Sequence, residues 1–399
     1  MTQPMEGSFD PDKRGRLIRR GGFLRRMAAP VAAVVGCLQP AIDPVFLTLL
    51  TTASHVAAVN HGWIVGVSQA GSGLGALGVW LAAARLPRGI GVAAAALALV
   101  CALLTPFASG LGMVLVLRGL FGLGLGAIYA LAMAIFAARR PSGAYATVLL
   151  AQSLVATLLS LAMPMVAMRA GETLALGLLA VAPGLAMLAM LFIEHAPDRP
   201  DRPQEPSQPV PLSAWSLACA TFWFICATMM VWSLSGALAM RAGLSEAVIG
   251  DAVALGSLAA AGTALAVMRE RVLLPLWLSA LLAGAALLAP LVMTRPGAPD
   301  AFILAMVVFN IGFTAMSIRC SGLASAMSRD PRFRMLVAAT HSLGMAGGPM
   351  LGSVAMWILP GRGLLLGAGF AVAAGIASVV VARLVQPRPG PRLRHVGRL

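Results

Sequence analysis

The amino-acid sequence predicts an all-α membrane protein in which twelve transmembrane helices form two six-helix halves. The first observation is composition: 59% of the 399 residues are hydrophobic and 11% are charged, whereas soluble domains carry about 25% charged residues. The second is that the apolar residues gather in runs long enough to cross the roughly 30 Å hydrocarbon core of a bilayer. The third is a strongly one-sided distribution of basic residues, typical of multi-pass membrane proteins.

Short polar breaks separate the apolar runs. The twelve spans are expected at 28–53, 61–84, 89–108, 112–138, 144–168, 173–194, 213–238, 246–268, 273–293, 300–326, 333–358 and 363–385. Residues 28–195 would then form an N-terminal bundle and residues 213–387 a C-terminal bundle. The remaining segments are a basic tail at 1–27, a Pro-rich linker at 196–212 and a second basic tail at 388–399. Such a Pro-rich, charged linker acts as a semi-extended tether.

The basic residues orient the chain. If the N-terminus is cytoplasmic, 23 of the 29 Lys and Arg fall in cytoplasmic tails and loops and four fall outside, while Arg118 and Arg319 lie within spans. The positive-inside rule therefore places both termini in the cytoplasm. Attraction of the tails to anionic membrane lipid explains the net charge of +15 without nucleic acid. Abundant Arg, Ala and Gly indicate a GC-rich bacterial genome, and hence a bacterial plasma membrane.

The two halves show traces of an internal repeat. When the second half is shifted by 184 residues, Gly66 meets Gly250 and Arg85 meets Arg269. At a shift of 189, "QSL" beginning at Gln152 meets "HSL" beginning at His341. Two parallel six-span repeats, with a solute bound between them near mid-membrane, are a transporter architecture.

With these features the chain resembles the major facilitator superfamily over nearly the whole span region. That family carries Arg-x-x-x-Gly-x-Gly in span 4, and "RGLFGLG" supplies Arg118, Gly122 and Gly124. The family motif in loop 2–3 is matched in part by "ARLPR", and the resemblance implies a gating role for Arg85 and Arg88.

The chain also departs from the family's motifs. In loop 2–3, Ala84 replaces the acidic residue and Pro87 replaces the second glycine. The Gly-Pro antiporter motif of span 5 is poor because Met163 precedes Pro164, and a better copy, "GMAGGPMLG", lies in span 11. These departures weaken an assignment as an antiporter. The glycines of "QAGSGLGALG" (69–78) are expected mainly to let helices approach closely.

Three ionisable residues lie deep in the expected spans: Asp43, Arg118 and Arg319. A charge near the bilayer centre costs about 2.5–3.5 kcal/mol on insertion scales, so such residues are functional candidates. The resemblance implies that spans 1 and 4 border a central cavity, where Asp43 and Arg118 can pair. We expect them to couple transport to protons, with rocking of the halves separating the pair; a static structural pair is the alternative. Arg319 is then the spare cation for an anionic substrate, unless it bonds to helix carbonyls or extends toward the interface.

The resemblance also implies a set of cavity-lining residues. They are Gln39, Tyr129, Trp223, Trp232 and Asn310. Packing or lipid-facing positions remain open for each. His341 and Gln152 occupy equivalent repeat positions, and a packed histidine is the alternative to a proton carrier.

The function expected from these features is secondary active transport of a small organic solute, leaning toward an organic anion and driven by protons. A proton-antiport multidrug exporter is the alternative within this class, and a non-transporting receptor or assembly subunit is the alternative outside it. An enzyme is disfavoured because the five histidines are scattered. We expect a monomer whose partners are the solute, protons and membrane lipid, with no nucleic acid, cofactor, metal or catalytic residue.

Overall fold

The computed structural model describes residues 11–54, 56, 60–138, 140–194, 209–268 and 274–386. Within these ranges the regular structure is helical and contains no strand. The N-terminal half comprises α1 (Pro11–Ser54), α2 (His61–Ala82), α3 (Ile90–Leu104) with the short 3₁₀ helix η2 (Thr105–Phe107), α4 (Leu111–Phe136), α5 (Pro141–Ala170), α6 (Glu172–Leu178) and α7 (Val181–Glu194). The C-terminal half comprises α8 (Leu212–Arg241), α9 (Glu246–Met268), α10 (Leu276–Met293), α11 (Pro299–Ala326), α12 (Pro331–Ile358) and α13 (Gly363–Leu384).

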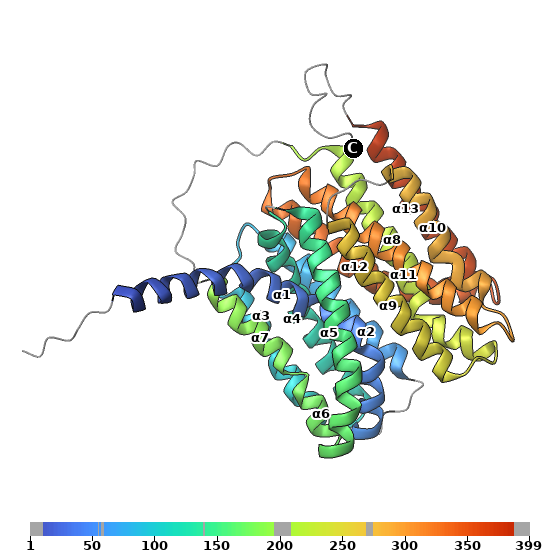
Figure 1. Cartoon of the computed structure of the whole chain (residues 1–399), viewed down its shortest axis with the longest axis horizontal. Helices are drawn as coiled ribbons and strands as arrows, with labels where there is room; N and C mark the ends of the chain where they lie inside the picture. Colours follow the sequence, from blue (N-terminus) through green and yellow to red (C-terminus); the bar gives the residue numbers. More distant parts are fainter. Residues whose placement is uncertain are drawn as a thin grey trace, which may run out of the picture.

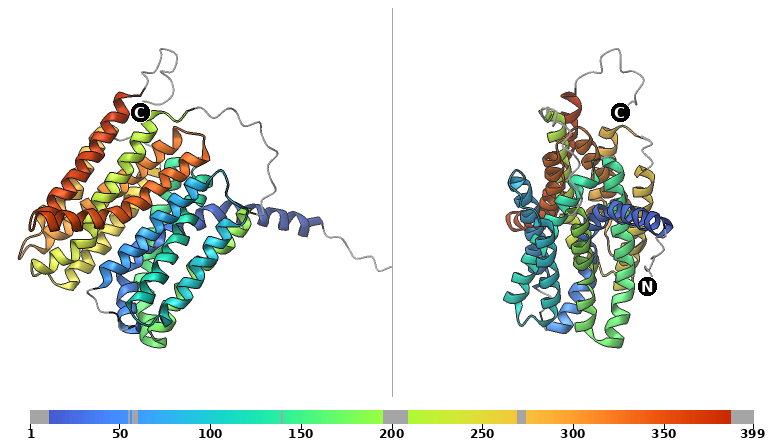
Figure 2. Two further views of the ribbon diagram at one scale, coloured as in Figure 1. Left: turned by 180° about the vertical axis from the view of Figure 1, so that it is seen from behind. Right: turned by 90° about the vertical axis from the view of Figure 1, so that its left-hand side faces the viewer.

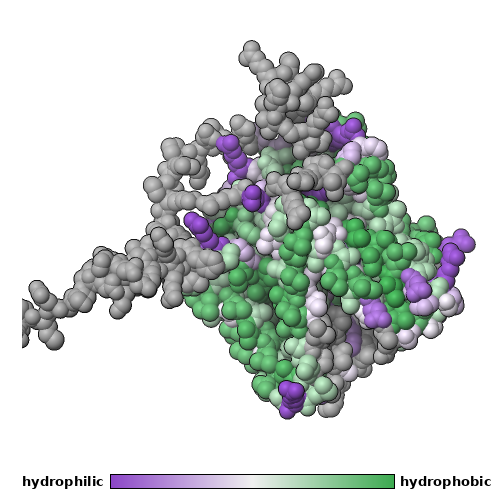
Figure 3. Space-filling model, in the orientation of Figure 1, coloured by the Kyte–Doolittle hydropathy of each residue, from purple (hydrophilic) through white to green (hydrophobic). Residues whose placement is uncertain are grey.

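Ten helical segments in the described ranges are long and apolar enough to cross a membrane, which fits a multi-pass membrane protein. Apolar side chains cover most of the flanks visible in Figure 3, and hydrophilic ones gather toward the ends. The two remaining predicted spans correspond to α1 and α12, which are long helices outside this set of ten. In α12 the polar sequence Thr340–Ser342 and several glycines dilute the apolar character.

Two features of the helices differ from the predicted spans. The helix α1 begins at Pro11, inside the segment expected as a tail, and its first part projects from the bundle (Figure 1). The span predicted at 173–194 is broken into α6 and α7 around Leu179 and Ala180. Pro183 favours this break because it has no N–H for the preceding turn, and short-range bonds such as Leu179 N to Leu176 O close the gap.

The two halves lie side by side (Figure 2) and share one packing plan. In the N-terminal half α1 packs on α4, α5 and α7, and in the C-terminal half α8 packs on α11, α12 and α13. The pairs α2–α4, α3–α4 and α3–α7 likewise correspond to α9–α11, α10–α11 and α10–α13. Each of these six helix pairs of the N-terminal half therefore has a counterpart at the same position in the C-terminal half.

Four helix pairs make the most extensive contacts between the halves: α2 with α12, α5 with α9, α4 with α12, and α5 with α11. At the end formed by residues 137–138 and 327–330, here called the loop face, the join includes hydrogen bonds. Arg334 Nε of α12 donates to the carbonyl of Ala134 at 2.8 Å, and the hydroxyls of Tyr145 and Ser325 lie 3.3 Å apart. The halves are thus held together at the loop face in this structure.

Glycines bring α2 and α4 into close contact. Gly71 and Gly75 of α2 face the backbone of α4, and Gly122 and Gly126 of α4 face the backbone of α2. At each position a Cβ atom would overlap a carbonyl of the facing helix. The expected packing role is therefore confirmed for Gly71 and Gly75, whereas a Cβ at Gly78 would meet nothing within 4 Å, and the contact sets Ser68 of α2 beside Arg118 of α4.

Candidate functional site

Arg118 lies inside the N-terminal half and is only 2% exposed. The rings of Phe46 and Phe121 each lie 4.3 Å from the guanidinium carbon, measured to the ring centroid. Such contacts attract a cation through the ring quadrupole. Nη2 donates to Ser68 Oγ at 3.2 Å, whereas Nε is buried without a hydrogen-bond partner. The charge is thus held by aromatic rings while part of its donor capacity stays unused.

Asp43 of α1 lies close enough to Arg118 for the two charges to interact, and it is 7% exposed. Its carboxylate accepts a hydrogen bond from Gln39 Nε2 at 2.5 Å and another from Gln69 of α2. Helical spacing explains the first contact, because residues four apart lie on the same face. Asp43, Gln39, Gln69, Ser68 and Arg118 thus form one polar network, here called the Asp43 network.

The Asp43 network lies within one half, which corrects part of the expected mechanism. Asp43 and Arg118 belong to α1 and α4, two packed helices of the N-terminal half. Rocking of rigid halves would leave this pair intact rather than separate it. Any change in the charge state of Asp43 must therefore come from water, from a ligand or from bending of α1.

Two cavities border the network. The first, here called the Arg118 cavity, comprises about 450 Å³ of space not filled by atoms, part of it open to solvent, and lies among α1, α3, η2, α4, α6 and α7. The second, the seam cavity, comprises about 310 Å³ of such space and lies among α1, α2, α4 and α12. Gln39 and Leu125 line both cavities, so the two spaces adjoin. Ser342 and Met345 of α12 complete the seam cavity, which therefore lies between the two halves.

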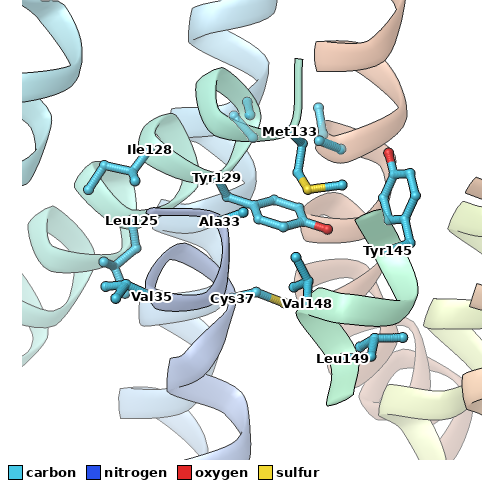
Figure 4. Close-up of a cluster of buried hydrophobic side chains, with 14 of the residues drawn as sticks. Ala33, Val35, Cys37, Leu125, Ile128, Tyr129, Met133, Tyr145, Val148 and Leu149 are labelled. Carbon is cyan, nitrogen blue, oxygen red and sulfur yellow. The ribbon is translucent and has the colours of Figure 1, made fainter. Parts of the chain in front are cut away.

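A second buried cluster lies beside the seam cavity and contains both repeat-related residues. Cys37 Sγ lies 3.4 Å from Gln152 Oε1 and 3.9 Å from His341 Nε2. Tyr129 packs on His341 with ring centroids 5.9 Å apart, and Figure 4 shows Tyr129 and Cys37 pointing toward α5. His341 Nδ1 is buried without a hydrogen-bond partner. The repeat thus brings Gln152 and His341 together on one sulfur atom between the halves.

The structure places Arg319 apart from this site. Arg319 is half-buried on α11, where Nη2 donates to the carbonyl of Leu274 at 2.9 Å and Nη1 donates to Ser279 of α10. One partner is a carbonyl that precedes α10 and the other is a serine hydroxyl of α10, so neither is a carbonyl within a helix.

Three of the residues expected to line the cavity in the C-terminal half lie away from the Asp43 network. Trp223 packs edge-on against Phe222 and Phe370, with ring centroids 5.1 and 5.5 Å apart. Trp232 stacks on Phe309 at 6.3 Å. Asn310 donates to the carbonyl of Met306 at 2.8 Å and packs against Gly256 of α9. Arg85 and Arg88 are exposed in the loop between α2 and α3.

Several site residues were not anticipated from the sequence. Ser68 and Gln69 are polar residues in an otherwise apolar span, a signal that points to burial against another polar group. Phe46 and Phe121 carry no such signal, because an aromatic residue in a span is ordinary. Their role depends on the position of the Arg118 guanidinium, which only the fold supplies.

Comparison of the sequence with models of known protein families and with curated proteins gives no match. The functional assignment therefore depends on the geometry of the site and on the motifs of the sequence.

Proposed function

We propose that this protein is a proton-coupled secondary transporter of a small organic anion, working by alternating access of its two six-helix halves. The proposal includes twelve spans, with α1 and α12 completing the ten candidates, and an arrangement resembling the major facilitator superfamily. It also places the protein in a bacterial plasma membrane with both termini cytoplasmic, on the distribution of its basic residues.

The observation that carries the proposal is a buried acid–base pair next to a cavity shared by both halves. Charges inside a membrane are expensive, and they are kept mainly on substrate, ion or proton pathways. Asp43 and Arg118 are both at least nine-tenths buried, and the network around them reaches the seam cavity through Gln39 and Gln69. A purely static pair would not need this contact with the space between the halves.

The seam cavity suggests how motion reaches Asp43. One wall is Ser342 and Met345 of α12, while Gln39 and Gln69 lie on the opposite side. Movement of the C-terminal half would withdraw the α12 wall and admit water to the two glutamines. Water at this position would give Asp43 a route for proton exchange although Asp43 and Arg118 stay in one rigid half.

The charges suggest how proton and solute are coupled. Burial favours the neutral carboxylic acid, whereas a neighbouring guanidinium favours the carboxylate. When Asp43 binds a proton, the charge of Arg118 is no longer balanced and can bind an anion instead. When the anion leaves, Arg118 again favours the ionised carboxylate and the proton is released. One proton would thus accompany one anion.

The test uses Asp43→Asn in proteoliposomes. The solute is chosen by a thermal-shift screen of the purified protein against carboxylates, sugars and lipophilic cations. Asn has a similar size but does not titrate, so accumulation driven by a proton gradient should vanish. Exchange of labelled for unlabelled solute at equal pH on both sides should survive.

A matched control is Asp251→Asn, which removes an exposed acid of α9 far along the chain. This variant should accumulate solute as the wild type does. An Asp43→Asn protein that still concentrates solute under a proton gradient would reduce Asp43 to a structural partner of Arg118.

A further inference from the structure

We infer that the Arg118 cavity is a binding site for an amphipathic monoanion, whose carboxylate meets Arg118 and whose apolar chain fills the rest of the space. The inference rests on the proposed function, because it names the class of substrate. The inferred anion site contains Arg118, whereas the sequence suggested Arg319 as the residue that binds the anion.

The walls of the Arg118 cavity are overwhelmingly apolar. Of its fourteen lining residues, the polar ones are Gln39, Thr105 and Arg118. Gln39 donates to Asp43, and the Thr105 hydroxyl donates to the carbonyl of Cys101 at 2.7 Å. Sugars and other polyols need many hydrogen-bonding groups, and these walls supply few.

Arg118 is arranged to receive a carboxylate at its edge. Phe46 and Phe121 both lie 4.3 Å from the guanidinium carbon, so aromatic rings occupy positions beside the cation. The donors of a guanidinium lie in its plane, where they match the two oxygens of a carboxylate. Nε is one such donor, and it is buried without a partner. An unsatisfied buried donor is costly, so a ligand that accepts its hydrogen bond gains affinity.

The far wall of the cavity is a break in the helical backbone. Leu176 of α6, Leu179 in the break and Ala182 and Pro183 of α7 all line the space. Non-helical backbone at membrane depth is tolerated where protein buries it or where it borders a cavity, and broken helices commonly border transporter sites. Figure 4 shows Val35 and Leu125 approaching each other on the side of α1 and α4 opposite to Tyr129, and both line this cavity. These apolar walls suit a hydrocarbon chain.

The sign of the charge and the shape together define the ligand. Once Asp43 has bound a proton, the Arg118 guanidinium is left to match one negative charge on a ligand, and a cation would be repelled. A short anion such as acetate would satisfy Arg118 but leave the apolar space unfilled, at a loss of about 0.8 kcal/mol for each CH₂ not buried. A medium-chain carboxylate satisfies both requirements.

The experiment measures binding of octanoate to the purified full-length protein in nanodiscs of uncharged phosphatidylcholine, by calorimetry and thermal shift. Octanoate should stabilise the wild type, acetate should bind at least tenfold more weakly, and octyltrimethylammonium should not bind. Arg118→Gln should weaken octanoate binding at least tenfold. Arg319→Gln, which removes an arginine outside the cavity, should change it less than twofold.

A second variant tests the apolar end without altering the charge. Ala182→Phe should fill the cavity and weaken octanoate at least tenfold while acetate changes little, and this holds as a test even if Arg118→Gln does not fold. Equal octanoate binding by the wild type and Ala182→Phe, or equal binding of octanoate and octyltrimethylammonium, would overturn the inference.

Further measurements distinguish a lipid headgroup from a free carboxylate as the bound anion, and they distinguish failure of this inference from failure of the proposed function. One outcome is that phosphatidylglycerol in the nanodisc stabilises the wild type but not Arg118→Gln, while octanoate stabilises neither protein. The occupant is then a lipid headgroup and the inference is wrong. Octanoate that binds but does not cross proteoliposome membranes would contradict transport and leave the site standing. If another solute is transported and octanoate does not bind, the inference about the Arg118 cavity is wrong and the proposed transport function stands.

Discussion

At the scale of single residues, the two deep arginines differ in how completely the protein satisfies them. Arg319 donates to Leu274 and Ser279, whereas Arg118 keeps a buried Nε without a partner. A donor satisfied by protein groups contributes to stability, and an unsatisfied one is available to a ligand. Residue type alone cannot distinguish the two roles, because the difference lies in the neighbours supplied by α10 and α2.

Arg319→Gln should therefore act on stability and not on solute binding. Loss of the bonds to α10 should lower the free energy of unfolding by about 1–3 kcal/mol, the range for hydrogen bonds to a charged group. Thermal unfolding in detergent should show a lower midpoint, and calorimetry should show solute affinity within twofold of the wild type. A tenfold loss of affinity with an unchanged midpoint would return Arg319 to the substrate site.

At the scale of elements, the contact between α2 and α4 is the tightest feature of the N-terminal half. Gly75→Ala places a methyl group against the carbonyl of Leu123, and overpacking of this kind costs about 1–3 kcal/mol. The midpoint of thermal unfolding in detergent should fall accordingly. Gly78→Ala is the matched control, because one turn along the same helix a Cβ meets nothing within 4 Å. Equal midpoints for the two variants would mean that the helices can separate without cost.

The elements also show what the sequence could predict. Apolar runs located the helices to within a few residues at most boundaries, because hydropathy reports how much of a segment avoids water. The weak internal repeat predicted equivalent positions for Gln152 and His341, and in the structure both side chains contact the sulfur of Cys37. The break between α6 and α7, the rings around Arg118 and the attachment of Arg319 to α10 were not foreseen. The break is marked in the sequence by Pro183, which hydropathy alone does not weigh. The rings around Arg118 and the bonds of Arg319 depend on which faces of the helices meet, and hydropathy does not record faces.

At the scale of the whole molecule, the join at the loop face should control transport. Gly322 of α11 faces Ser142 of α5 so closely that a Cβ built on the glycine lies 2.9 Å from Ser142 Cβ. Disulfides have a mean Cβ–Cβ distance of about 3.8 Å, so a small shift would allow one to form. Ser142→Cys with Gly322→Cys, in a background where the exposed Cys219 is replaced by Ser, should cross-link under mild oxidation.

The cross-linked protein should bind solute but not move it across a proteoliposome membrane, and a reducing agent should restore transport. The Ser142→Cys variant alone, treated with the same oxidant, should transport normally, and the double variant kept reduced is the baseline that carries the added Cβ of Gly322→Cys. Full transport by the cross-linked protein would mean that the loop face does not open, and the alternating-access proposal would fail.

The length of α1 has a mechanical consequence. At 1.5 Å per residue its 44 residues extend for about 66 Å, roughly twice the thickness of a bilayer core. Its first part projects from the bundle, and the sequence from Lys13 to Arg26 holds seven basic residues (Figure 2). This arm is continuous with the part of α1 that packs in the N-terminal half, so tilting that half would move the positively charged arm relative to the lipid headgroups. Under the proposed alternating access, the surface charge of the membrane would then exert a torque on the protein and enter the energy difference between its two states.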